Sequence, residues 1–165
     1  MATGLELIGS PAKGRPTLGE RVPVQMFRAL RLVGVMEGMD KAIGDASALI
    51  YASGQGLGEA MGKQILEKSG KDLHRFVEGT INTMRELGVG ILSVTKADLE
   101  NHLIVLQVNE CITCAGIPAV DKTVCDFEAG VVSGILGAFL ETPVTVVESK
   151  CWGAGDQYCE FEATY

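Results

Sequence analysis

The sequence predicts an α+β domain, with an antiparallel sheet of about four strands and helices packed on one side of it. Apolar residues recur every three or four positions through most of the first half of the chain, as in amphipathic helices. Two pairs of β-rich segments follow, separated by one more helical segment. This order of helices, hairpin, helix and hairpin is typical of the α+β class. A chain of 165 residues is long enough for one domain with its own core.

The composition limits the partners and the compartment that we expect. Hydrophobic residues make up 47% of the chain and charged residues 21%, a balance typical of globular proteins. The formal net charge of −7 predicts repulsion from phosphate backbones, so we expect no direct contact with nucleic acid. The N-terminus lacks a secretory pattern, and the longest apolar run, 129–140, is shorter than the roughly 20 residues of a membrane-spanning helix. We therefore expect a cytoplasmic protein without a membrane partner, whose cysteines serve as thiols or metal ligands.

The first part of the chain predicts an arm and two helices. Residues 1–21 lack periodicity and are expected to form an N-terminal arm, with residues 22–165 as a single domain. An amphipathic helix is predicted from Val24 to Gly38, with Pro23 suited to its first turn, and a longer helix from Asp40 or Asp45 to about Lys68.

The longer helix carries small residues at intervals of four, namely Ala46, Gly54, Gly58 and Gly62 with Ile50 between them. Each glycine costs about 1 kcal/mol relative to alanine in a helix. We interpret this stripe as a face that another helix approaches closely, or that lines a cavity. The alternative is a helix that breaks near residues 53–56, with the spacing accidental.

A third helix and a hairpin come next. The helix is predicted from Leu73 to Gly88, and the hairpin from strands Ile91–Lys96 and Leu103–Val108. His74 and His102 have no second histidine or cysteine at ligand spacing, so both are expected to be exposed.

The last third of the chain predicts a helix and a second hairpin. The helix runs from Thr123 to Leu140, with Asp121 as a candidate N-cap, and repeats the spacing of four at Gly130, Gly134 and Ala138. Strands are predicted at Val144–Glu148 and Gln157–Ala163.

Cys125, Glu148, Cys151 and Cys159 are candidate metal ligands. A turn centred on Gly153-Ala154 would place Glu148 opposite Cys159, with Cβ atoms about 4.5–5.5 Å apart. Cys151 would then need a β-bulge to reach the same face, and Cys125 would come from the first turn of the preceding helix. Three thiolates and a carboxylate make a closed tetrahedral zinc shell, which indicates a structural role. The alternative is that these cysteines are small core residues.

Two runs of the sequence, 125–134 and 146–161, resemble the 4-vinyl reductase domain family. This family consists of small-molecule-binding modules that share the fold of the TRAPP transport subunits. In its phenol-responsive members a zinc is held by Cys, Glu, Cys and Cys, and Cys125, Glu148, Cys151 and Cys159 reproduce the gaps of 23, 3 and 8 residues. The resemblance therefore implies that these four residues bind a structural zinc.

The resemblance implies a stand-alone domain that binds or senses a hydrophobic small molecule, and a homodimer in which the first helix could supply the interface. The histidine and tryptophan residues that grip phenol in those sensors have no clear counterpart here, so the ligand-binding residues stay open. We predict no catalytic residue.

Two other functions remain as alternatives. One is a reductase acting on a vinyl-bearing tetrapyrrole, although no phosphate-cradling G-x-G-x-x-G follows a strand. The other is an iron–sulfur or redox protein using the additional Cys-x-x-Cys of Cys111 and Cys114, which is half of a metal-binding pattern.

Overall fold

The computed structural model describes residue 5 and residues 9–15, 17–18 and 21–165. The predicted N-terminal arm lies partly outside these residues, and its described part contains one short helix, α1 (Pro11–Gly14). The division into an arm and one domain stays a prediction. Among the described residues, no helix is both long enough and apolar enough to span a bilayer.

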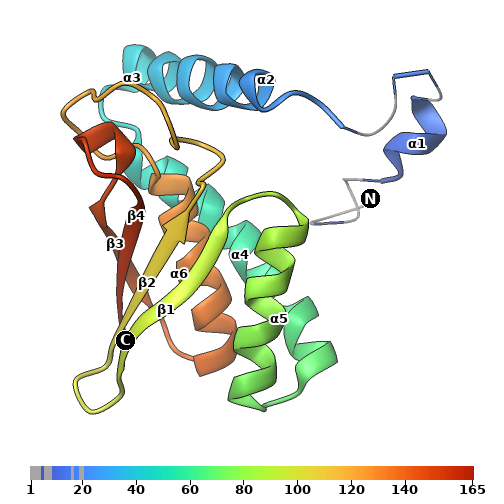
Figure 1. Cartoon of the computed structure of the whole chain (residues 1–165), viewed down its shortest axis with the longest axis vertical. Coiled ribbons are helices and arrows are strands. Elements are labelled where there is room, and N and C mark those ends of the chain that lie inside the picture. The colour runs from blue at the N-terminus through green and yellow to red at the C-terminus, as the bar shows by residue number, and fades with distance from the viewer. Residues whose placement is uncertain (1–4, 6–8, 16, 19–20) are drawn as a thin grey trace.

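The sheet has four antiparallel strands, which confirms the predicted fold class. The strands lie in the order β1-β2-β4-β3 and comprise β1 (Ile91–Asp98), β2 (Leu103–Asn109), β3 (Thr145–Lys150) and β4 (Cys159–Thr164). Both predicted hairpins are present, and β2 pairs with β4 to join them into one sheet. Three long helices gather on one side of this sheet (Figure 1): α4 (Ser47–Ser69), α5 (Leu73–Glu86) and α6 (Asp126–Leu140).

The first long helical run extends further than predicted. It comprises α2 (Val24–Arg28), a π-helical stretch (Ala29–Glu37) and α3 (Gly38–Ile43), and it crosses one end of the molecule (Figure 1). The predicted end at Gly38 is wrong, because Gly38 keeps helical dihedral angles with φ −64 and ψ −42. The run ends before Gly44, whose φ of +82 is outside the helical region. Pro23 precedes the helix as its N-cap residue rather than lying in its first turn.

Helices α4 and α6 pack with their backbones almost in contact, which confirms the close approach predicted from the glycine stripe. A Cβ atom added at Gly54 or Gly58 would lie within 3.0 Å of the backbone of α6. The same holds in reverse for Gly130 and Gly134, whose Cβ atoms would meet the backbone of α4. The helix therefore continues through residues 53–56, and the alternative of a break there is wrong.

The start of α6 also differs from the prediction. Its N-cap residue is Cys125, and Asp121 lies four residues earlier in the loop with a φ of +57. The predicted cap is wrong because the chain at Asp121 is still in a left-handed turn. The consequence is that Cys125 is held at the exposed amide end of the helix, next to the sheet.

Candidate metal centre and apolar cavity

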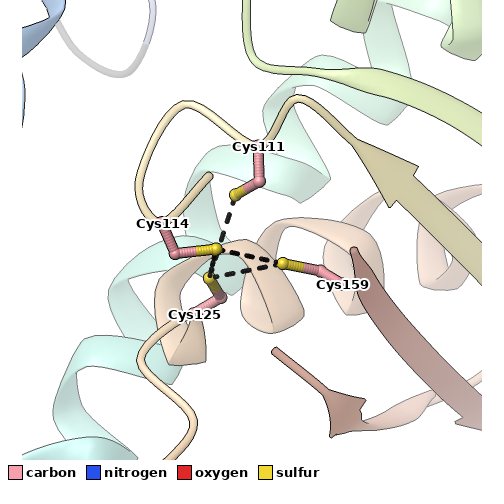
Figure 2. A group of neighbouring side chains, drawn as sticks. All are labelled: Cys111, Cys114, Cys125 and Cys159. Carbon is pink, nitrogen blue, oxygen red and sulfur yellow. Dashed lines mark hydrogen bonds between the residues drawn. The ribbon is translucent and has the colours of Figure 1, made fainter. Parts of the chain in front are cut away.

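All five cysteines of the chain meet in one buried cluster at the end of the sheet. None has more than 1% of its surface exposed, and they come from four different places: the loop after β2 (Cys111, Cys114), the N-cap of α6 (Cys125), the residue after β3 (Cys151) and the start of β4 (Cys159). Figure 2 shows four of these side chains pointing toward one another. Segments far apart in the sequence therefore deliver their thiols to a single point.

The cluster contains two overlapping groups of metal-ligating atoms. The first is the predicted set, Cys125, Glu148, Cys151 and Cys159, whose ligand atoms all lie within 4.8 Å of one another. The second meets the same limit and consists of Cys111, Cys114, Cys125 and Cys159. The structure thus brings the predicted ligands together and adds Cys111 and Cys114 to them. Their role as metal ligands stays a prediction.

The path by which Glu148 and Cys159 meet differs from the predicted hairpin register. Glu148 lies opposite Phe161 rather than Cys159, and Cys159 pairs with Val108 of β2. The connection is longer than the assumed tight turn because residues Trp152–Ala154 form a 3₁₀ turn, which the Asp156 carboxylate anchors by accepting from the Cys151 amide at 2.9 Å. The expected bulge is present as a register shift between Glu148 and Lys150.

The distances between sulfur atoms suit tetrahedral coordination. A zinc–sulfur bond of about 2.3 Å places sulfur atoms about 3.8 Å apart around one ion. The Cys125 Sγ lies 3.8 Å from that of Cys111, 3.5 Å from Cys114, 4.0 Å from Cys151 and 3.9 Å from Cys159. The Cys114 and Cys159 sulfurs are closer, at 3.1 Å.

Glu148 has one carboxylate oxygen available for a cation. Its Oε2 accepts a hydrogen bond from the Cys125 amide at 3.0 Å, whereas its Oε1 is buried without a hydrogen-bond partner. Burial, with the negative charge of Cys151, raises the pKa of Glu148 to about 9. A buried polar atom without a partner is costly, so a bound cation would both ionise and satisfy this carboxylate. The residues present therefore fit a metal ion.

The thiols influence each other's protonation. The hydrogen bond with Cys114 is the largest effect that lowers the pKa of Cys111 and of Cys151. Interaction with Cys111 in turn raises the pKa of Cys125 and of Cys159. Negative charge on some of these thiols opposes ionisation of the others, so they cannot all be thiolates unless a cation neutralises them.

Arg28 holds the loop that carries Cys111 and Cys114. Its Nε donates to the Ile112 carbonyl at 2.6 Å, and its Nη2 donates to the carbonyl of Ala115 at 2.9 Å and, more weakly, to that of Cys111 at 3.4 Å. The sequence analysis missed this residue, because its partners are backbone atoms more than eighty positions away. A charged residue on the helix that precedes Arg31 by one turn was the only signal.

A second charged group, Arg31 and Glu128, is buried beside the cluster. The closest atoms are Arg31 Nη2 and Glu128 Oε2 at 3.8 Å, and Thr113, between the two cysteines of the loop, donates to Glu128 Oε1. Burial, then the charge of Cys111, raises the pKa of Glu128 to about 7. Glu128 also lines the cavity described next, so it connects the cysteine cluster to that space.

A cavity of about 1140 Å³ lies between the helices and the sheet. Its wall is made mainly of apolar side chains from α5, α6 and the cavity-facing positions of the strands, among them Phe76, Met84, Leu106, Val131, Phe139 and Phe161. Cys111 and Glu128 lie at its boundary, and so does exposed His74. His102 is exposed as expected. Trp152 does not line this cavity among the described residues.

The fold and this site define an α+β domain with an apolar cavity beside a cysteine cluster. Residues 104–165 match the family model of the 4-vinyl reductase domain. The chain is also 34% identical over 145 residues to the uncharacterised protein MJ0150 of Methanocaldococcus jannaschii, covering 88% of this chain and 77% of the relative. The chain belongs to the 4-vinyl reductase domain family, as its C-terminal motifs predicted.

Solved structures share the fold at low sequence identity. The phenol-responsive sensory domain of the transcription activator PoxR, solved with phenol, is 15% identical with a TM-score of 0.66, covering 88% of this chain and 76% of that one. A trafficking protein particle complex subunit 3 from Naegleria fowleri, covalently bound to palmitic acid, is 16% identical with a TM-score of 0.66, covering 86% and 93%. These likenesses show that the chain has the TRAPP-subunit-like fold that was predicted.

Proposed function

We propose that this protein binds a hydrophobic small molecule and that a structural metal ion, zinc, closes the end of the domain. The observation that carries the proposal is the apolar cavity of about 1140 Å³ between the helices and the sheet. Ligand cavities are typically about 300–1,000 Å³ and mostly apolar, with few polar groups. This cavity has that character, with Thr80 and Glu128 among its few polar residues.

The neighbouring structures support an apolar ligand, since one was solved with phenol and another with palmitic acid. We infer that the ligand lies along the helix–sheet interface with its apolar body against α5 and α6. Glu128 is the polar group most suited to meet a hydrogen-bond donor on the ligand, because its Oε2 is buried without a hydrogen-bond partner.

The metal part of the proposal depends on Cys125, Glu148, Cys151 and Cys159. They fit zinc because thiolates and a carboxylate are ligands it accepts, and four protein ligands leave no open position for catalysis. An iron–sulfur cluster is the second candidate, favoured by the four-cysteine group that includes Cys111 and Cys114. All five cysteines are free thiols in the structure, which supports a reducing compartment such as the cytoplasm.

Filling the cavity is expected to weaken binding of an apolar probe. Ile104 lines the cavity from β2, and the next residue, Val105, is equally half-buried but points to the opposite face of the sheet. We expect Ile104→Trp to weaken binding of the uncharged fluorescent probe N-phenyl-1-naphthylamine by about tenfold or more, a loss of about 1.4 kcal/mol. The measurement is a fluorescence titration of protein freed of co-purified ligand by partial unfolding and refolding.

Val105→Trp is the matched control and is expected to bind the probe as the wild type does. Equal affinity of both variants and the wild type would contradict the cavity as the binding site. Native mass spectrometry of the wild type, before ligand removal, would then show whether another molecule accompanies the protein.

We propose further that the protein is a homodimer joined through its first long helix. Met26, Leu30 and Val33 on this helix are 60%, 61% and 59% exposed, so they form an apolar stripe without a partner among the described residues. Neighbouring exposed apolar residues of this kind mark interaction surfaces. Because a two-fold dimer uses the same patch on both chains, the stripe would meet its own copy.

A charge in this stripe is expected to give a monomer. Leu30→Lys places two like charges at a two-fold interface, and we expect the mass measured by light scattering after gel filtration to fall by half. Val147→Lys is the control, since Val147 is also 61% exposed but lies on β3 opposite Glu162. A wild type that is already monomeric at about 100 μM would show the dimer proposal to be wrong, because stable interfaces hold at far lower concentrations.

A further inference from the structure

We propose that the cysteine cluster holds two divalent metal ions, bridged by the thiolates of Cys125 and Cys159. One ion would be bound by Cys111 and Cys114 together with the bridging pair. The other would be bound by Glu148 and Cys151 together with the same pair. This inference extends the metal site of the proposed function from one ion to two.

The division of the ligand atoms carries the proposal. The cluster offers two groups of four, and the two groups have two members in common, Cys125 and Cys159. Each group therefore has two ligands of its own and two that it shares. Two tetrahedral ions joined along one shared edge need this arrangement, with two terminal ligands for each ion and two bridging thiolates.

The position of Cys125 supports a bridging role. Its sulfur is 3.5 Å and 3.8 Å from the sulfurs of Cys114 and Cys111 on one side, and 4.0 Å from that of Cys151 on the other. The two bridging sulfurs are 3.9 Å apart, close to the edge of about 3.8 Å expected for a tetrahedral zinc–sulfur shell. Figure 2 shows Cys125 and Cys159 facing the pair from the loop after β2.

Burial of the additional pair argues against a single ion. If one ion occupied the group with Glu148, the side chains of Cys111 and Cys114 would be left without a ligand role, although they are 1% and 0% exposed and touch the bridging sulfurs. Six ionised ligands carry six negative charges, of which one divalent ion leaves four and two leave two. A buried cluster is much less costly with the smaller excess.

The loop that carries the additional pair is also held in place. Arg28 binds three carbonyl groups between Cys111 and Ala115, and the Ile112 amide donates to the Val89 carbonyl at 2.9 Å. Such outer contacts orient ligands before the metal arrives. Arg28 also places a positive charge beside a cluster that keeps a negative excess. The pair is therefore presented to the site rather than packed there by chance.

The test is the number of metal ions per chain, measured by native mass spectrometry on protein purified without oxygen. The wild type loaded with zinc is expected to hold two ions. Cys111→Ser with Cys114→Ser should hold one, and Glu148→Gln with Cys151→Ser should also hold one, because each pair removes the terminal ligands of a single ion. After loading with cadmium-113, the wild type should give two NMR resonances split by coupling through the shared thiolates, and each double variant one unsplit resonance.

Arg28→Gln keeps all six ligands and serves if a double variant fails to fold. It is expected to release one of the two ions to a chelator at least tenfold faster than the wild type does, and the other at an unchanged rate. Equal release of both ions at wild-type rates would overturn the role of the held loop and with it the second ion.

Three outcomes separate this inference from the proposed function. One zinc in the wild type, kept by the Cys111 and Cys114 variant and lost by the Glu148 and Cys151 variant, overturns the second ion and leaves the single structural zinc. A brown protein with iron and acid-labile sulfide overturns both metal proposals in favour of a cluster. Failure to bind the apolar probe, with two ions present, overturns the ligand function alone.

Discussion

Gly58→Ala is expected to destabilise the protein strongly, although alanine is the better helix former. In an open helix the change would stabilise by about 1 kcal/mol. At Gly58 the new Cβ would lie within 3.0 Å of the Val131 backbone, which cannot move without shifting α6. We expect a loss of about 3 kcal/mol or more. Since about 1 kcal/mol corresponds to roughly 2–4 °C in a chain of this size, the melting temperature should fall by about 6–12 °C in a thermal scan.

Gly56→Ala is the matched control in the same helix. A Cβ at Gly56 meets nothing within 4 Å, so only the helix propensity changes and the variant should melt at or slightly above the wild-type temperature. Similar effects of the two substitutions would contradict the backbone contact between α4 and α6. Because this contact positions α6, it also positions Cys125 at the N-cap and the wall of the cavity.

Cys159→Ser is expected to cost even more stability, because it removes a ligand that both groups share. Structural zinc contributes on the order of 10 kcal/mol to the folding of small zinc domains. Even half of that, about 5 kcal/mol, corresponds to a melting temperature lower by about 10–20 °C. The measurement is thermal unfolding under reducing conditions, followed by circular dichroism, with the metal content determined on the same samples.

A chelator distinguishes metal binding from simple packing of the cysteine. The wild type with a strong chelator should melt near the temperature of Cys159→Ser, whereas the chelator should leave the variant unchanged. If instead the wild type ignores the chelator and the variant still melts low, the cysteine acts as a small buried residue, the alternative left open by the sequence. This experiment does not depend on whether one or two ions are bound.

Local patterns were sufficient to predict the elements of the fold. The period of the apolar residues gave the helices, and the β-rich segments gave both hairpins, because side chains must alternate between core and solvent within each element. The glycine spacing in 46–62 predicted a close helix neighbour, and the similar spacing in 130–138 belongs to that neighbour. Boundaries were less accurate, as the extension past Gly38 and the cap at Cys125 show.

The predicted ligand set was brought together in space, but by a different route. Counting residues across the last hairpin assumed a two-residue turn, and the 3₁₀ turn at Trp152–Ala154 with the bulge after Glu148 shifted the register. The resemblance nevertheless named the residues correctly as neighbours, because the gaps of a family motif already include such irregularities.

The sequence by itself determined the class of fold, the family and the gathering of Cys125, Glu148, Cys151 and Cys159, because these depend on local periodicity and on fixed spacing. Only the tertiary structure decided that Cys111 and Cys114 join the same cluster, since β2 must first pair with β4 to bring Val108 beside Cys159. It also decided the role of Arg28 and the volume of the cavity. Both arise from contacts between segments far apart in the chain, and no local pattern records such contacts.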